Sequence, residues 1–203
     1  TPLNAVTAHK QYSEMADTPN VHTTQVQRQQ VQDAYPSRLT TPPEKTWLPR
    51  QDAVVKGRQL SGPLSQAQLD EFERKGFLFI PNLIAGAELE ELRQEMKALM
   101  SNDEYLNQDF SVTEPESQEI RSLFAVHFLS ERLGKLASDE RVAGAARQII
   151  GDDPYVHQSR INYKPGFAGK GFNWHSDFET WHAEDGMPAM HAVSASLILT
   201  DNH

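Results

Sequence analysis

The chain has 203 residues, which is enough for one domain with a substantial core and too few for two ordinary ones. Its 28 acidic and 19 basic residues give a net charge of -9, and this negative surplus argues against binding to nucleic acid, whose phosphates require a basic surface. Cysteine is absent, so disulfides, thiolate metal sites and cysteine nucleophiles are excluded, and any bound metal must have nitrogen and oxygen ligands.

The apolar runs of the sequence are too short for a membrane helix. The runs at 77–80 and 197–199 fall far short of the roughly 20 residues that are needed to cross a bilayer. The first residues also lack the apolar core of a secretory signal. We therefore expect a soluble, cytoplasmic protein that binds no membrane.

Residues 1–60 differ in composition from the rest of the chain. They are rich in glutamine, threonine and proline, whereas all nine phenylalanines lie at or after Phe72. A segment with so few large apolar side chains cannot offset the entropy that is lost when its backbone is ordered. We expect a mobile or loosely helical tail over 1–33, an extended arm over the proline-rich stretch 35–63, and a folded domain over 61–203.

Helices are predicted in the first half of this domain. Apolar residues recur there at helical spacing, and the first helix has a capping box at Ser65 to Gln68 and a closing glycine, Gly76. These signals predict helices over 65–75, 86–100, 120–136 and 139–150, with one short buried strand over 77–80.

Strands are predicted after Gly151, where β-rich pieces alternate with glycine loops. The pieces that fit best cover 155–164, 172–181 and 193–200. Helices followed by strands indicate a mainly β domain with flanking helices, in which the helices pack outside a sheet sandwich or barrel.

His175 and Asp177 are candidate metal ligands. Residues two apart on a strand project from the same face, so this imidazole and carboxylate can reach one ion. Such a pair supplies two of the three ligands of the two-histidine-one-carboxylate site, which holds Fe(II) and leaves positions open for a cosubstrate and oxygen. Taken by itself, the spacing is more often a surface hydrogen bond.

Longer stretches of the sequence carry more information than this spacing. The chain contains the words IRSLF at 120–124, HQSRINYKPGF at 157–167, FNWHSDFETWH at 172–182, EDGMP at 184–188 and LTDN at 199–202. In these words it resembles the phytanoyl-CoA dioxygenase-like family of Fe(II)- and 2-oxoglutarate-dependent dioxygenases, and within that family the branch that hydroxylates ectoine. The resemblance covers about residues 60 to 203.

The resemblance implies a double-stranded β-helix, or jelly-roll, core. It also implies an enzyme that uses Fe(II), 2-oxoglutarate and O2 to convert ectoine into 5-hydroxyectoine, with succinate and CO2 as further products, and it suggests a homodimer. The alternatives are a related hydroxylase of another small amino acid or solute, and a catalytically silent jelly-roll that only binds ligands.

Roles for the metal and cosubstrate residues follow from the same match. His175 and Asp177 match the first two iron ligands of the family. Lys164 matches a residue that binds 2-oxoglutarate, whose distal carboxylate needs a cation. Asn162 lies one strand repeat before it and could bond the same molecule. Without the motif, Lys164 would be read as a solvated lysine at a strand end.

Two further residues match positions that contact ectoine. The amide of Gln158 could serve the carboxylate and the amidine of that zwitterion, and the indole face of Trp181 suits a delocalised cation. Pairing of Gln158 with backbone and core packing of Trp181 are the competing interpretations. We expect structural or supporting roles for His157 and His182, and a satisfied core position for His127.

The family pattern includes two groups that this sequence does not match. The resemblance places a second histidine ligand and an arginine for 2-oxoglutarate beyond residue 203, and His203 continues a loop of the family. We therefore expect a jelly-roll that is incomplete at the C-terminal end of this chain. We also expect the 203 residues alone to bind iron weakly and to be inactive.

Overall fold

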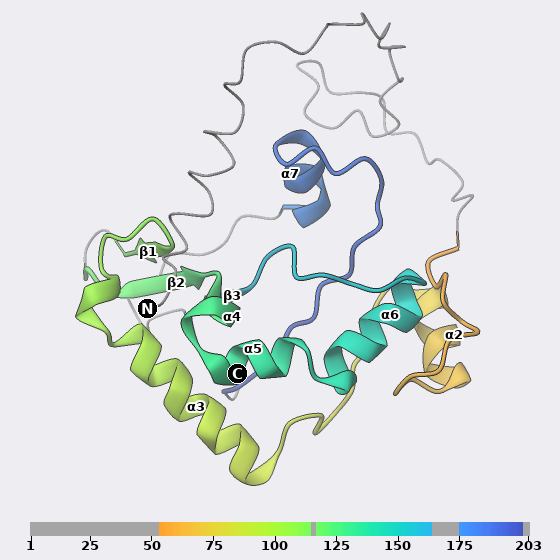
Figure 1. Cartoon of the computed structure of the whole chain (residues 1–203), viewed down its shortest axis with the longest axis horizontal. Helices are drawn as coiled ribbons and strands as arrows, with labels where there is room; N and C mark the ends of the chain where they lie inside the picture. The colour runs from red at the N-terminus through yellow and green to blue at the C-terminus, as the bar shows by residue number, and fades with distance from the viewer. Residues whose placement is uncertain (1–52, 115–116, 164–174, 201–203) are drawn as a thin grey trace, which may run out of the picture. The chain divides into compact units, whose positions relative to one another are not determined.

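The structure is a computed structural model that describes residues 53–114, 117–163 and 175–200 (Figure 1). The chain divides between Leu48 and Pro49, and all described residues belong to the second unit. Their elements in chain order are α2 (Gln66–Lys75), α3 (Gly86–Met100), η1 (Asp103–Tyr105), β1 (Ser111–Thr113), β2 (Ile120–Phe124), α4 (Val126–Leu129), α5 (Glu131–Ala137), η2 (Glu140–Gly144), α6 (Ala145–Ile150), β3 (Arg160–Asn162) and α7 (Asp177–Ala183).

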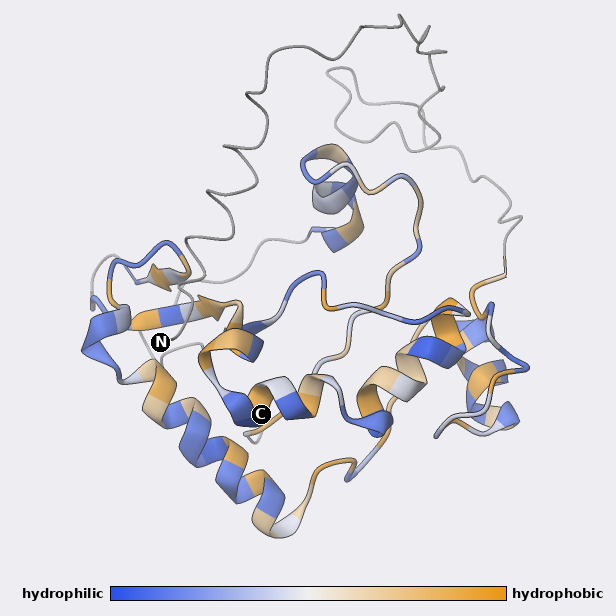
Figure 2. Ribbon diagram, in the orientation of Figure 1, coloured by the Kyte–Doolittle hydropathy of each residue, from blue (hydrophilic) through white to orange (hydrophobic). Residues whose placement is uncertain are grey.

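Three of the predicted helices are confirmed. In α2 the hydroxyl of Ser65 accepts from the backbone N–H of Gln68, whose side chain returns to the cap, and Gly76 closes the helix with a φ of 78°. The predicted helix over 86–100 is α3, which buries Leu92 and Leu99. The predicted helix over 139–150 is divided into η2, a π-helical segment, and α6. Figure 2 shows the mixture of polar and apolar residues along α2 and α3 that amphipathic helices require.

The predicted helix over 120–136 is wrong in its first part. Its first five residues form β2, and helix begins only with α4, after Ala125, whose φ of 55° lies in the left-handed region. The strand is hydrogen-bonded along both edges, to β1 and to β3. This pairing decides the conformation because the spacing of Ile120, Leu123 and Phe124 is compatible with a strand as well as with a helix.

Most of the predicted strands are also wrong. In the described part of the stretch 155–164, which ends at residue 163, Arg160–Asn162 alone forms a strand, β3, and neither 77–80 nor 193–200 forms one. The stretch 172–181 contains the start of α7, and residues 172–174 lie outside the described residues. Here the hydroxyl of Ser176 caps a helix whose first turn is acidic, and these local signals outweigh the β-like composition.

The three strands form one antiparallel sheet in the order β1-β2-β3 (Figure 1). Ser122 of β2 faces Asn162 of β3, and Phe124 faces Arg160. The sheet thus fixes the positions of two polar side chains in β3. More of the described residues lie in helices than in strands. The three short strands do not form a jelly-roll by themselves, so the jelly-roll core stays a prediction.

Two apolar clusters hold these elements. One joins α2 and α6 through Leu69 and Ile149, and the other packs α3 and α4 on β2 through Leu99, Leu123 and Val126. None of the helices in the described residues is long and apolar enough to cross a membrane.

The described part of the predicted arm packs against α6. Gln148, which is 2% exposed, donates to the carbonyls of Leu60 and Leu64 at 3.3 and 3.0 Å and accepts from the N–H of Leu64 at 2.8 Å. The backbone N–H of Gly57 donates to the Gln148 carbonyl at 3.1 Å. A Cβ on Gly57 would lie 2.7 Å from the Cα of Gly151, so the close approach requires glycine there.

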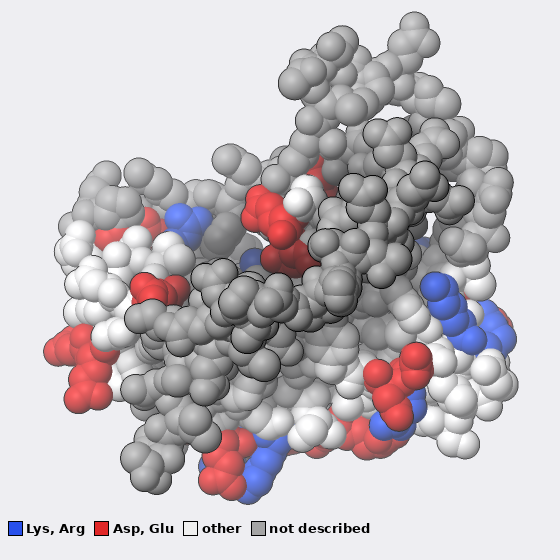
Figure 3. Space-filling view, turned by 45° about the horizontal axis from the view of Figure 1, so that its top comes forward, with Lys and Arg blue, Asp and Glu red and all other residues white. Residues whose placement is uncertain are grey.

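Acidic and basic side chains lie next to one another on the face in Figure 3, and the described residues on that face form no continuous basic surface. The ion pairs include Arg141 with Glu88 at 2.6 Å and Arg147 with Glu140 at 3.1 Å. That nucleic acid is not a partner stays a prediction from the net charge.

Candidate metal and substrate site

The two predicted metal ligands lie side by side where α7 begins. The Nε2 atom of His175 is 3.4 Å from Oδ1 of Asp177. Asp177 is the first residue of α7, so the prediction that the two side chains share the face of a strand is wrong, and the helix start brings them together instead. Their side chains are 51% and 33% exposed, which leaves both accessible to an ion.

The donor set and spacing of this pair fit a metal ion. Ligand atoms about 2.1 Å from one ion and at right angles around it lie about 3 Å apart. A neutral imidazole nitrogen and a carboxylate oxygen are also the ligand types of the Fe(II) site with two histidines and one carboxylate. The described residues contain no group of three histidine, aspartate or glutamate side chains around a common point.

Arg160 is a residue of this site that the sequence reasoning missed. It lies in β3, and its Nη2 atom is 3.7 Å from Oδ1 of Asp177. The guanidinium places a positive charge beside the carboxylate that is the candidate metal ligand. The alternation of Gln158, Arg160 and Asn162 along an extended segment was the available signal, because alternate residues of a strand share a face.

The predicted cosubstrate residues lie in and after β3. The side-chain oxygen of Asn162 accepts from the hydroxyl of Ser122 at 2.9 Å, across the β2–β3 pair. This bond fixes the amide of Asn162. Lys164 lies outside the described residues.

The predicted substrate residues lie on the two segments that meet at α7. Gln158 is exposed and lies two residues before β3. Trp181 is half-buried and lies four residues after Asp177, on the same face of α7. The ring of His157, next to Gln158 in the chain, meets the indole of Trp181 edge to face, with the ring centres 5.2 Å apart. The structure therefore brings the segment of Gln158 to the helix of Asp177 and Trp181.

His182 and His127 each bond a neighbouring group, and His127 is only partly buried. His182 donates from Nδ1 to the carbonyl of Met187 at 2.6 Å and stacks on Phe178. His127 lies in α4 and contacts the hydroxyl of Ser159 through Nδ1, and burial lowers the pKa of its imidazole. Neither contact is that of a metal ligand.

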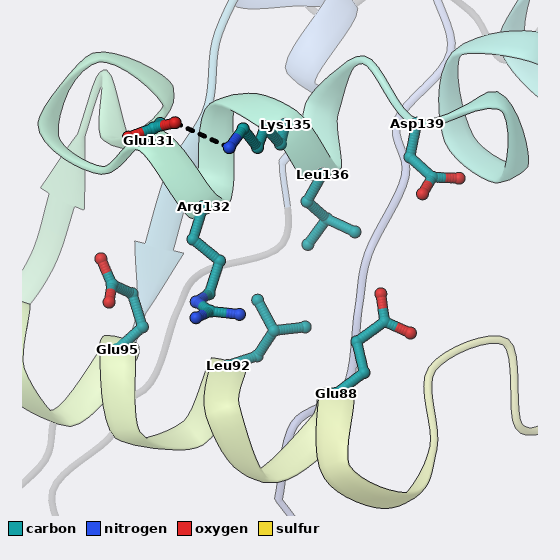
Figure 4. A pocket seen from close by; sticks show the side chains of 8 residues that line it. All are labelled: Glu88, Leu92, Glu95, Glu131, Arg132, Lys135, Leu136 and Asp139. Carbon is teal, nitrogen blue, oxygen red and sulfur yellow. Dashed lines mark ion pairs between the residues drawn. The ribbon is translucent and has the colours of Figure 1, made fainter.

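A cleft of about 460 Å³ lies elsewhere, between α3 and α5 (Figure 4). Glu88, Leu92 and Glu95 line it from α3, and Glu131 and Lys135, which form an ion pair of 2.7 Å, lie on the other side. None of the predicted site residues lines it.

Comparison with known families gives the class of the protein. A family model described as phytanoyl-CoA dioxygenase (PhyH) matches residues 72–203. The chain therefore belongs to the phytanoyl-CoA dioxygenase family, as the sequence words indicated.

Within this family the chain is similar to proteins named ectoine dioxygenase. It is 66% identical over 172 residues to the one from Halomonas elongata, covering 85% of this chain and 52% of the relative. It is 51% identical over 174 residues to the one from Streptomyces coelicolor, covering 85% of this chain and 57% of that relative. The chain thus spans about half the length of the curated relatives it matches.

Solved structures of EctD from S. alaskensis are similar to the chain as well. The structure with 2-oxoglutarate and 5-hydroxyectoine is 44% identical with a TM-score of 0.71, over 79% of this chain and 56% of that one. The structure with bound Fe is 45% identical with a TM-score of 0.66, over 70% of this chain and 51% of that one. The described elements therefore follow the EctD architecture.

Proposed function

We propose that the protein is an Fe(II)- and 2-oxoglutarate-dependent dioxygenase that hydroxylates ectoine to 5-hydroxyectoine. The observation that carries the proposal is the pair of His175 and Asp177, 3.4 Å apart, in a chain that is 66% identical to an ectoine dioxygenase. The related EctD binds Fe in one structure, and 2-oxoglutarate with 5-hydroxyectoine in another.

In this proposal Nε2 of His175 and Oδ1 of Asp177 hold the iron, and the third protein ligand comes from outside the described residues. When bound, Fe(II) supplies the oxygen chemistry, in which one atom of O2 enters ectoine and the other enters succinate as 2-oxoglutarate loses CO2. Arg160 forms an ion pair of 3.7 Å with the same carboxylate oxygen of Asp177.

The chain's other residues bind the two organic molecules. Lys164 offers its ammonium group to the distal carboxylate of 2-oxoglutarate, and Asn162, whose amide is fixed by Ser122, bonds the same molecule. Gln158 contacts the polar groups of ectoine, while the indole of Trp181 lies against its delocalised cation. Placement of the ectoine ring beside the metal position is the part of catalysis that these residues supply.

The proposal is tested by turnover in protein expressed from its own reading frame. We expect 5-hydroxyectoine and succinate in equal amounts, and no product without Fe(II) or without 2-oxoglutarate. Succinate release with proline or another solute, and none with ectoine, would favour the related hydroxylase. No coupled binding of Fe(II) and 2-oxoglutarate in calorimetry would favour the silent binding module.

Substitution of the ligands locates the chemistry. We expect His175→Ala and Asp177→Asn to weaken Fe(II) binding by more than about 100-fold. This exceeds the loss of metal affinity that is usual when a residue that only hydrogen-bonds to a metal ligand is replaced. His191→Ala and Asp70→Asn are matched controls, since His191 bonds a backbone carbonyl and Asp70 pairs with Arg58 on the surface. Equal Fe(II) affinity in the ligand variants and the controls would remove His175 and Asp177 from the site.

A further inference from the structure

His157 and Asp185 connect the two segments that carry the proposed ectoine-binding residues. Oδ2 of Asp185 accepts a hydrogen bond from Nε2 of His157 at 3.1 Å. His157 precedes Gln158 directly, and Asp185 follows α7, which carries Trp181. The bond therefore links the segment before β3 to the end of α7.

The ring of His157 also contacts the indole itself. The two ring centres are 5.2 Å apart with the planes at 75°, which is the edge-to-face geometry that aromatic pairs favour. The ring of Tyr155 also meets the imidazole edge to face, with the two ring centres 6.4 Å apart. Because Asp185 fixes the rotation of the imidazole, it also fixes the edge that the imidazole presents to Trp181.

The carboxylate of Asp185 is itself held in place relative to Trp181. The backbone N–H groups of Asp185 and Met187 both donate to the carbonyl of Trp181, at 3.1 and 3.0 Å. Gly186 between them has a φ of 73°, a conformation that glycine adopts without strain. The side chain of His182 closes this turn through its bond to the Met187 carbonyl. The turn that carries Asp185 is thus hydrogen-bonded to the backbone of Trp181, and the indole of the same residue contacts the His157 ring.

We infer that His157, held by Asp185, is a positioning residue that fixes the indole of Trp181 beside Gln158 and thereby sets the affinity for ectoine. This inference rests on the proposed function, because it takes Trp181 and Gln158 as the residues that contact ectoine. It concerns the residues proposed for ectoine and not those proposed for the cosubstrate, since His157 bonds Asp185 whereas Asn162 bonds Ser122.

The test compares His157→Phe and Asp185→Asn with the wild type in protein expressed from its own reading frame. The first variant keeps an aromatic ring and loses the hydrogen bond, and the second keeps the shape of the acid and loses its charge. We expect the KM for ectoine to rise about fivefold to tenfold in each, with the KM for 2-oxoglutarate and the affinity for Fe(II) unchanged. The double variant should be no worse than His157→Phe alone, because that variant has already removed the partner of Asp185.

His191→Phe and Asp70→Asn serve as matched controls and should leave the KM for ectoine at the wild-type value. A rise in both KM values with a lower melting temperature would show a merely structural role and would overturn the inference. So would an unchanged KM for ectoine in variants of an active wild type. If the wild type does not hydroxylate ectoine at all, the proposed function fails first, and the inference falls with it.

Discussion

At the residue scale, one buried amide connects the N-terminal arm to the domain. Gln148 is 2% exposed and makes hydrogen bonds to the backbone of Leu60 and Leu64. Burial of a polar side chain costs little free energy when its hydrogen bonds are made. Its removal costs much more, because its former partners are then buried without hydrogen bonds. Among the described arm residues, Val55 is the one buried in this cluster, next to Leu64 just beyond the arm, so the amide supplies much of the arm's attachment.

We therefore predict that Gln148→Leu destabilises the protein by about 2–3 kcal/mol, because it leaves backbone groups of the arm without partners in the interior. Urea unfolding followed by circular dichroism measures this free energy. Gln94→Leu is the control, since Gln94 bonds Glu90 on the exposed surface of α3, and it should change stability by less than about 0.5 kcal/mol. Similar midpoints for the two variants would contradict the role of Gln148.

The site residues show how far sequence reasoning reaches at this scale. His175 and Asp177 were predicted as a pair from the motif, and the structure brings them together at 3.4 Å. The physical reason given for the pair was wrong, because a helix start and not a strand holds them. Arg160 was missed since its contact with Asp177 depends on how β3 and α7 are brought together, which no local pattern encodes.

At the element scale, one arginine joins the helices around η2. Arg141 bonds both oxygens of Glu88 in α3, at 2.9 and 2.6 Å, and both oxygens of Asp139, at 2.9 and 2.8 Å. These hydrogen bonds lower the pKa of the Asp139 carboxyl from 3.8 to about 2, and they lower the pKa of Glu88. The π-helical segment is thereby tied to a helix more than 50 residues earlier in the chain.

This network predicts a loss of stability in acid. A carboxyl whose pKa is lower in the folded state adds stability above its ordinary pKa, and the contribution disappears as the pH falls through the folded value. We expect the melting temperature to fall between about pH 5 and pH 2, and to fall less steeply in Arg141→Met. Arg132→Met, which removes the exposed pair with Glu91, should keep the wild-type pH dependence. The same slope in both variants would contradict the network.

Helices were predicted better than strands, for a physical reason. Helix ends are marked by local signals, here the capping box at Ser65 and the glycines Gly76 and Gly151. The helices that begin or end at these residues are present in the structure. A strand exists only through its partner, so the stretch 193–200 is not a strand despite its alternation, and Ile120–Phe124 is one despite its helical spacing.

At the scale of the whole molecule, the family was predictable and the complete active site was not. Long words of sequence indicated the phytanoyl-CoA dioxygenase family, and the match over residues 72–203 confirms it. The described residues contain the two proposed metal ligands and no group of three that could hold a metal ion. Lys164 lies outside them, so the proposed 2-oxoglutarate anchor and the jelly-roll core stay predictions.

The central claim is that the protein transfers oxygen from O2 to ectoine at the pair of His175 and Asp177. Its most direct test supplies isotopically heavy O2 together with Fe(II), 2-oxoglutarate and ectoine to protein expressed from its own reading frame, and follows both products by mass spectrometry. We predict one heavy oxygen atom in 5-hydroxyectoine and one in succinate, and neither product in Asp177→Asn. Unchanged ectoine, or the same labelled products in the Asp177 variant, would contradict the account.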